Sequence, residues 1–220
     1  MKTLSCSTIL LVIVALPLAA QDFNVDMYDH YGVPSDTYGA AGQPGAWNAI
    51  PDMTAFDPPV ELVDTAGAAT AVTLSFPLSF GGLAEGWIDD AQATGDDHAL
   101  LEDGFWSSDI PNRARFQNLA DGEYEVKAYG IVTSDEGALT TFLFNGASAG
   151  ACGGIWNGTF EEGVTHVLGI VNVSGGMLDV DWVNGGGWGG YGMMSGIQLD
   201  YIEPVGTEAS TWSSVKELFE

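Results

Sequence analysis

The stretch RARFQNLADGEYEVKAY, residues 113–129, decides the fold class. On both sides of the turn signal Asp121-Gly122, apolar residues alternate with polar ones, which is the period of a strand with one buried face. The same alternation recurs, between Gly-rich turns, in residues 69–76, 139–144, 166–173, 177–183 and 193–202. Many short strands without a helical period between them predict an all-β chain folded as an antiparallel β-sandwich or jelly roll.

Three segments depart from this pattern. Residues 81–111 set aromatic residues among many acidic ones without a clear period, which predicts a long loop region with one short helix. Residues 28–59 are rich in Gly, Pro and aromatics, and only Trp47–Ile50 has the pattern of a strand. At residues 205–220 we expect a short amphipathic helical tail, because apolar side chains recur on one helical face after a Ser/Thr-rich start. Such a tail either docks on the sandwich or serves an export or attachment system.

The N-terminal residues have the pattern of an export signal. Lys2 precedes the apolar run Thr8–Leu16 and the small-residue exit Leu18-Ala19-Ala20, which predicts a signal peptide over residues 1–20 that is removed on export. The alternative, a membrane anchor, needs roughly 20 apolar residues, more than this run supplies. We therefore expect a secreted protein, extracellular or at the cell surface, with one sandwich domain over residues 21–204 and no membrane insertion.

The net charge of the chain limits the kinds of partner that we expect. Without the signal peptide the chain keeps four basic residues against 30 acidic ones, a net charge of −26 with histidine neutral. A field of that sign repels phosphate backbones and anionic lipids, so nucleic acid is not an expected partner, whereas neutral sugars and divalent cations remain possible. Acidity also has a simpler explanation, the solubility of an exported protein.

The mature chain holds one cysteine, Cys152, which we expect to be a small packed residue.

Several short motifs, taken in order, resemble the galactose-binding-domain-like jelly roll of exported bacterial proteins, a fold that carbohydrate-binding modules use. The motifs are FNVD at residues 23–26, the L-x-D-G-x-Y-x-V hairpin at residues 119–126, and the closing strand SGIQLDYI at residues 195–202. The resemblance covers most of the mature chain. It implies the fold more than any ligand, because the same motifs recur both in sugar-binding modules and in architectural relatives that bind no sugar.

The resemblance also implies calcium as a structural cofactor. In such families a calcium ion often lies where the first and last strands meet, and Asp26 and Asp200 occupy comparable positions in this sequence. Carboxylate oxygens are the ligands that calcium prefers. The alternative is that both are solvated surface acids.

Aromatic residues supply the candidate ligand-binding positions. A sugar site needs flat aromatic faces for the apolar side of a pyranose, and carboxylates or amides for its hydroxyls. Trp182 alternates within a strand and is expected in the sheet. The candidates instead lie beside Gly, Asn or Asp in apparent loops: Trp47, Trp87, Trp106, Trp156, Trp188 and Tyr191. For any single tryptophan the alternative is a ring that closes the end of the sandwich.

These features favour a non-catalytic, lectin-like protein whose partner is an extracellular polysaccharide or surface glycan. A structural or adhesive surface protein is the alternative, and it predicts buried tryptophans together with a flat apolar patch or a free strand edge. A glycoside hydrolase comes third. Asp89-Asp90, Asp96-Asp97 and Glu102-Asp103 supply carboxylate pairs, but loop neighbours do not define the separation that this chemistry needs.

Overall fold

The computed structural model describes residues 21–77, 83–134, 137–186 and 190–202. Its fourteen strands and one helix run in the order β1 Phe23–Met27, β2 Trp47–Ile50, β3 Val60–Val63, β4 Ala69–Ser75, β5 Ala84–Trp87, α1 Asp96–Leu101, β6 Asp103–Ser107, β7 Asn112–Gln117, β8 Gly122–Tyr129, β9 Thr140–Phe144, β10 Ala147–Cys152, β11 His166–Val173, β12 Met177–Asn184, β13 Gly192–Met194 and β14 Gly196–Ile202. The predicted signal peptide, the C-terminal helix and Trp188 lie outside the described residues.

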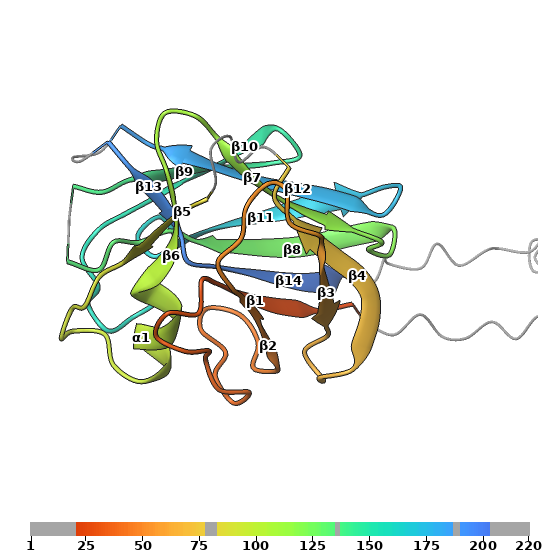
Figure 1. Cartoon of the computed structure of the whole chain (residues 1–220), viewed down its shortest axis with the longest axis horizontal. Helices are drawn as coiled ribbons and strands as arrows, with labels where there is room; N and C mark the ends of the chain where they lie inside the picture. Colours follow the sequence, from red (N-terminus) through yellow and green to blue (C-terminus); the bar gives the residue numbers. More distant parts are fainter. Residues whose placement is uncertain (1–20, 78–82, 135–136, 187–189, 203–220) are drawn as a thin grey trace, which may run out of the picture.

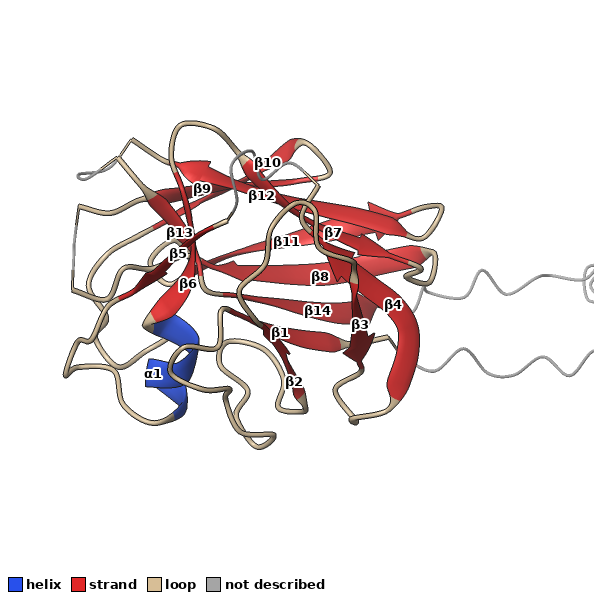
Figure 2. Cartoon of the chain, viewed as in Figure 1, coloured by secondary structure: helices blue, strands red, loops and turns tan. Residues whose placement is uncertain are grey.

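The strands form a sandwich with a small third sheet at one end (Figure 1). One layer has the order β11-β8-β14-β1-β2, and the other has the order β10-β9-β12-β7-β4-β3. The third sheet, β13-β6-β5, lies beside α1 at the left of Figure 2. Every strand pair is antiparallel except β1 with β2. The predicted all-β sandwich is confirmed. In the described ranges no helix is long and apolar enough to cross a membrane.

In β4, β7 and β9 the period-two pattern buries one face of the strand in the core. In β7, Ala114 and Phe116 are fully buried, and Phe116 lies opposite Leu178 of β12. Each fully buried side chain of this size stabilises the fold by roughly 1.5–3 kcal/mol relative to an exposed one. The intervening residues, Arg113 and Arg115, face outward and pair with acidic residues of β12. Alternation in the sequence therefore places the core between the two layers.

The segment from residue 113 to residue 129 is not a hairpin, which corrects one expectation. Its two strands belong to different sheets, because β7 pairs with β4 and β12 whereas β8 pairs with β11 and β14. The connection crosses the sandwich with Asn118 at a positive φ of 65°, and the Tyr124 hydroxyl donates to the Ala120 carbonyl (3.2 Å). The two-residue hairpin turn is Asn145-Gly146 between β9 and β10, where both φ angles are positive.

The connection from Tyr28 to Ala46 covers part of the outer face of the five-stranded sheet. Three hydrogen bonds tie it to α1: the Ser35 amide (2.9 Å) and hydroxyl (2.8 Å) both donate to Asp96, and the Tyr38 hydroxyl donates to Asp97 (2.6 Å). Beneath it lies a second apolar cluster, separate from the main core, which includes Leu100 and Tyr129. Residues 81–111 contain the predicted short helix, but they also form β5 and β6, which the sequence pattern did not predict.

Candidate functional site

Five rings gather at the end of the sandwich where the chain leaves β1, and we call them the aromatic face. They come from three separate segments: Tyr28, His30 and Tyr31 follow β1, Trp87 ends β5, and His98 lies in α1. Trp87 points to this side because it lies directly opposite Asp103 in the β5–β6 pair, on the same face of the small sheet as Phe105. Tyr28 packs against both Trp87 and Phe105.

The rings of the aromatic face order one another. His30 stacks on Trp87 with ring centroids 4.6 Å apart and planes 19° apart, and on Tyr28 at 5.8 Å. Tyr31 packs against His98 at 4.2 Å. Trp87 nevertheless remains 51% exposed. The stacking therefore fixes the indole while leaving about half of it to solvent, so it forms a preorganised platform.

Carboxylates surround these rings. The Asp89 carboxylate lies 3.7 Å from His98 Nε2 and is almost fully exposed. Asp29 is exposed in the turn that carries the rings. Glu85 hydrogen-bonds Tyr28, and burial together with this bond raises the pKa of the phenol. The aromatic face is therefore rimmed by hydrogen-bond acceptors, a combination that suits a ligand with apolar ring faces and many hydroxyls.

Two buried carboxyl groups lie beneath the aromatic face. Asp26 and Asp103 have no solvent exposure, and Asp103 Oδ2 accepts a hydrogen bond from the Tyr31 amide (2.8 Å). Among the residues that the structure describes, both carboxylate oxygens of Asp26 and the Oδ1 atom of Asp103 lack a hydrogen-bond partner. Burial raises the pKa of Asp103 to about 7. It raises the pKa of Asp26 well above its ordinary value, and the neighbouring charge of Asp103 adds to that rise.

A second aromatic pair lies on the other face of the small sheet. The Trp106 indole packs directly over Gly86, where a Cβ atom would approach its Nε1 to 0.9 Å. Tyr191, 52% exposed, meets Trp106 edge to face at 5.9 Å. Alternate residues of a strand point to opposite faces, so Trp87 and Trp106 do not contact one ligand ring together.

Two of the predicted ligand-binding tryptophans are buried. Trp47 is 8% exposed and Trp156 is 2% exposed, and both belong to the apolar cluster beneath the connection that follows β1. The Trp47 indole N–H donates to the Tyr38 carbonyl (3.1 Å), so this ring holds the connection in place. Their expected role as surface platforms is therefore corrected to a structural one. Trp182 is buried in the main core, as predicted.

The structure does not bring the predicted calcium ligands together. Asp26 lies opposite Gly196, four residues along β14 from Asp200, which is roughly 13 Å at about 3.4 Å per residue. Asp200 instead accepts from Lys127 Nζ (2.9 Å) and from Gln43. Over the described ranges no group of three or more acidic, histidine or cysteine side chains is arranged to hold a metal ion.

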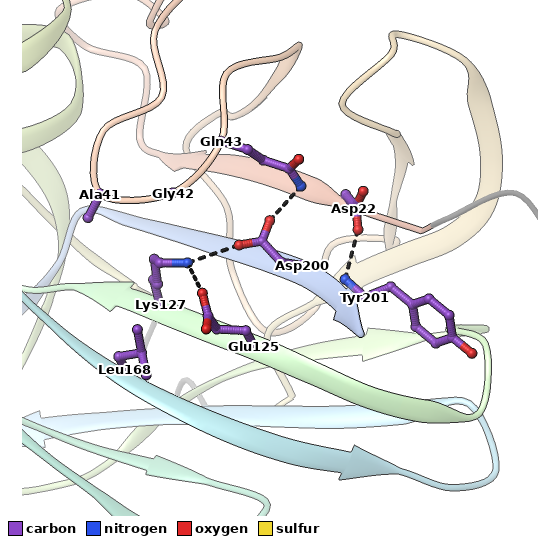
Figure 3. Close-up of a pocket in the computed structure, with 9 residues that line it drawn as sticks. All are labelled: Asp22, Ala41, Gly42, Gln43, Glu125, Lys127, Leu168, Asp200 and Tyr201. Carbon is purple, nitrogen blue, oxygen red and sulfur yellow. Dashed lines mark hydrogen bonds and ion pairs between the residues drawn. The ribbon is translucent and has the colours of Figure 1, made fainter. Parts of the chain in front are cut away.

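Asp200 forms part of a hollow of 560 Å³ on the outer face of the five-stranded sheet (Figure 3). Lys127 points between Glu125 and Asp200, and the Asp22 carboxylate accepts the Tyr201 amide (2.7 Å). The Lys127 ammonium pairs with two of these carboxylates, and the third is bonded to a backbone amide. The wall of the hollow is therefore already committed to internal bonds, whereas the aromatic face presents groups that are open to solvent.

The sequence patterns did not single out Tyr28, His30, Tyr31 or His98 as site residues. His30 and His98 are 68 positions apart, and neither has metal-ligand spacing to any other histidine. A usable signal was local: three ring-bearing residues within four positions, directly after an apolar strand and beside an acid. Such a group is too polar to continue the core and too aromatic for an ordinary solvated turn.

Comparisons with known proteins assign no family. No family model matches the chain, and no curated protein matches it. Solved structures share parts of its architecture. Protein YxiM of Bacillus subtilis does so at 12% identity and TM-score 0.45, over 83% of this chain and 40% of that one. A Bacteroides uniformis β-glucuronidase is similar at 13% identity and TM-score 0.43, over 82% of this chain and 18% of that one. A third similar structure is the CBM36-1 domain of a multidomain xylanase from the hindgut metagenome of Trinervitermes trinervoides. It has 13% identity and TM-score 0.34, over 56% of this chain and 90% of that one. The chain thus spans less than half the length of the first two.

Proposed function

We propose that this protein binds carbohydrate at the aromatic face, without catalysis. The observation that carries the proposal is the half-exposed Trp87 indole, held by stacking on His30 and rimmed by carboxylates. An aromatic platform covers the apolar face of a pyranose, and nearby carboxylates accept hydrogen bonds from its hydroxyls. A strongly acidic protein favours neutral glycans over anionic ones. Export, predicted by the N-terminal residues, would place the protein among extracellular polysaccharides.

Two of the three acidic pairs of residues 81–111 are held within the fold, which supports binding rather than hydrolysis; of the third pair, Asp89-Asp90, Asp89 is exposed beside His98. Asp96 and Asp97 are taken up by hydrogen bonds to Ser35 and Tyr38. Glu102 and Asp103 are fully buried beneath the aromatic face. A glycoside hydrolase needs two carboxyl groups that flank a bond of the substrate, so acids used for anchoring or buried under the rings do not supply that pair.

Titration with soluble polysaccharides tests the proposal. Intrinsic fluorescence of the full chain is recorded against xylan, laminarin, mannan and galactan. We expect a saturable shift with at least one of them, lost in Trp87→Ala. Tyr191→Ala is the matched control, because that ring is equally exposed but lies on the opposite face of the small sheet. No saturable shift with any of the four, from folded protein, would contradict the proposal.

A structural or adhesive role is the second candidate. The observations that favour it are the burial of Trp47, Trp156 and Trp182 and the position of β11 at the edge of the five-stranded sheet, with Ile170 52% exposed. Strand edges that lack charged residues are prone to pair with other chains. This role predicts concentration-dependent association that Ile170→Lys prevents, measured by sedimentation. Under the carbohydrate proposal, that variant leaves ligand binding unchanged.

A further inference from the structure

We propose that the aromatic face selects glycans that carry positively charged amino groups, such as deacetylated amino-sugar polymers, over neutral glycans of the same backbone. This ligand class belongs to the site proposed above and therefore rests on the proposed function. Two properties of the site carry it. One is the open indole of Trp87, and the other is the common sign of the charges placed around that ring.

The Trp87 indole has one face left for a ligand. His30 stacks on the ring with centroids 4.6 Å apart and planes 19° apart, which covers one face of the indole. Tyr28 packs beside the same ring at 6.3 Å. Because Trp87 is still 51% exposed, its other face is open to solvent. An aromatic face attracts a cation as well as the apolar side of a sugar, since the ring is electrically negative above its plane.

Acidic side chains lie beside this open ring. Glu85 precedes Trp87 by two positions on β5, so both side chains leave the same face of that strand. Asp89 follows Trp87 by two positions, and its side chain is 83% exposed although it lies 3.7 Å from His98 Nε2. Asp29 is exposed in the turn after β1. Carboxylates accept hydrogen bonds from hydroxyl groups, but the bonds that they form with ammonium groups are stronger, because both partners are charged.

Within the described ranges no lysine or arginine offsets these acids. Arg113 and Arg115 lie on β7 and pair with acids of β12, and Lys127 lies on β8 and pairs with acids of the five-stranded sheet. The basic groups at the aromatic face are histidines, and His98 already pairs with Asp89. The field at the open ring is therefore negative. Such a field favours a bound cation over a neutral group of similar shape, so an amino group distinguishes the preferred glycan from its neutral counterpart.

Calorimetry with two matched ligands tests the selection. The ligands are a β-1,4-linked glucosamine oligomer and its N-acetylated form of the same length, at pH 6, where the free amines carry charge. We expect the full chain to bind the amine form about tenfold or more tightly, the size expected of one cation–π contact together with one exposed ion pair. Added salt should reduce the difference, because it screens exposed charges. Equal affinity, or tighter binding of the N-acetylated form, overturns the selection.

Variants distinguish selection at the aromatic face from general attraction to an acidic surface. Trp87→Ala should abolish binding of the amine form. Asp89→Asn and Asp29→Asn, which change exposed side chains, should weaken the amine form several-fold more than the N-acetylated form. Glu123→Gln is the matched control, because this exposed acid lies at the start of β8, at the far end of the five-stranded sheet from the aromatic face. Amine binding that survives in Trp87→Ala, or that Glu123→Gln weakens as much as Asp89→Asn, overturns the selection.

The neutral polysaccharides separate this selection from the proposed function. Binding of xylan, laminarin, mannan or galactan that requires Trp87 supports the proposed function whatever the two oligomers show. With such binding in hand, an amine form that binds no more tightly than its N-acetylated form contradicts the selection alone. Failure of all four polysaccharides and of both oligomers contradicts the proposed function, and the selection falls with it.

Discussion

Stability should fall as the pH rises from 4 to 8, because burial raises the pKa values of Asp26, Glu102 and Asp103, and the contribution of Asp103 can be worked out. Its folded-state pKa is about 7, whereas an unfolded aspartate titrates near 3.9. Between these values the folded protein holds a proton that the unfolded chain has released. A raised folded-state pKa contributes stability that is complete below about pH 4 and is lost as the pH passes through about 7. Three pKa units at 1.36 kcal/mol each correspond to a loss of about 4 kcal/mol.

Urea unfolding at a series of pH values measures this loss. In Asp103→Asn this contribution disappears while those of Asp26 and Glu102 remain, so between pH 4 and 8 its unfolding free energy should fall by about 4 kcal/mol less than that of wild type. Asp36→Asn controls for the general effect of removing one charge from an acidic protein. His166, whose pKa is lowered by burial, acts in the opposite direction, but it is present in all three proteins. Parallel curves for wild type and Asp103→Asn would refute the reasoning.

Three further changes test the packing that supports the site. Trp182→Phe removes the donor to the Phe105 carbonyl (3.0 Å) and should cost about 2 kcal/mol of unfolding free energy in urea, because a buried acceptor loses its partner. Gly86→Ala should displace the Trp106 indole, which occupies the place of the new Cβ, and should lower the melting temperature and shift tryptophan fluorescence. Asp179→Asn weakens pairing with Arg115 on a partly exposed sheet face, so it should cost only about 1 kcal/mol, less at high salt.

Much of the fold follows from local sequence pattern. β2 and β11 begin and end where the alternation predicts, since one polar and one apolar face suffice to define a strand that packs on a core. β5 and β6 were not predicted. Their sequences, AEGW and DGFWS, contain the glycine over which Trp106 packs and the acid that is buried at Asp103. Gly86 and Asp103 both interrupt the alternation of polar and apolar residues, and the reason for each lies in contacts that only the tertiary structure shows.

The site was less predictable than the fold. Trp87 was correctly placed on the surface, but Trp47 and Trp156 have similar local surroundings and are buried. The difference is that Tyr38 packs on Trp47 and Phe160 packs on Trp156 within one apolar cluster, which local sequence does not reveal. Burial of Asp26 was also unexpected, because an isolated acid in a strand usually faces solvent.

The most direct test of the central claim is the affinity of a soluble polysaccharide for Trp87→Ala, measured by calorimetry at pH 5.5 beside wild type and Tyr191→Ala. Loss of a stacking platform should weaken binding about tenfold or more, equivalent to about 1.4 kcal/mol, while Tyr191→Ala binds like wild type. Wild-type affinity in folded Trp87→Ala, or loss of binding in Tyr191→Ala alone, would contradict a carbohydrate site at the aromatic face.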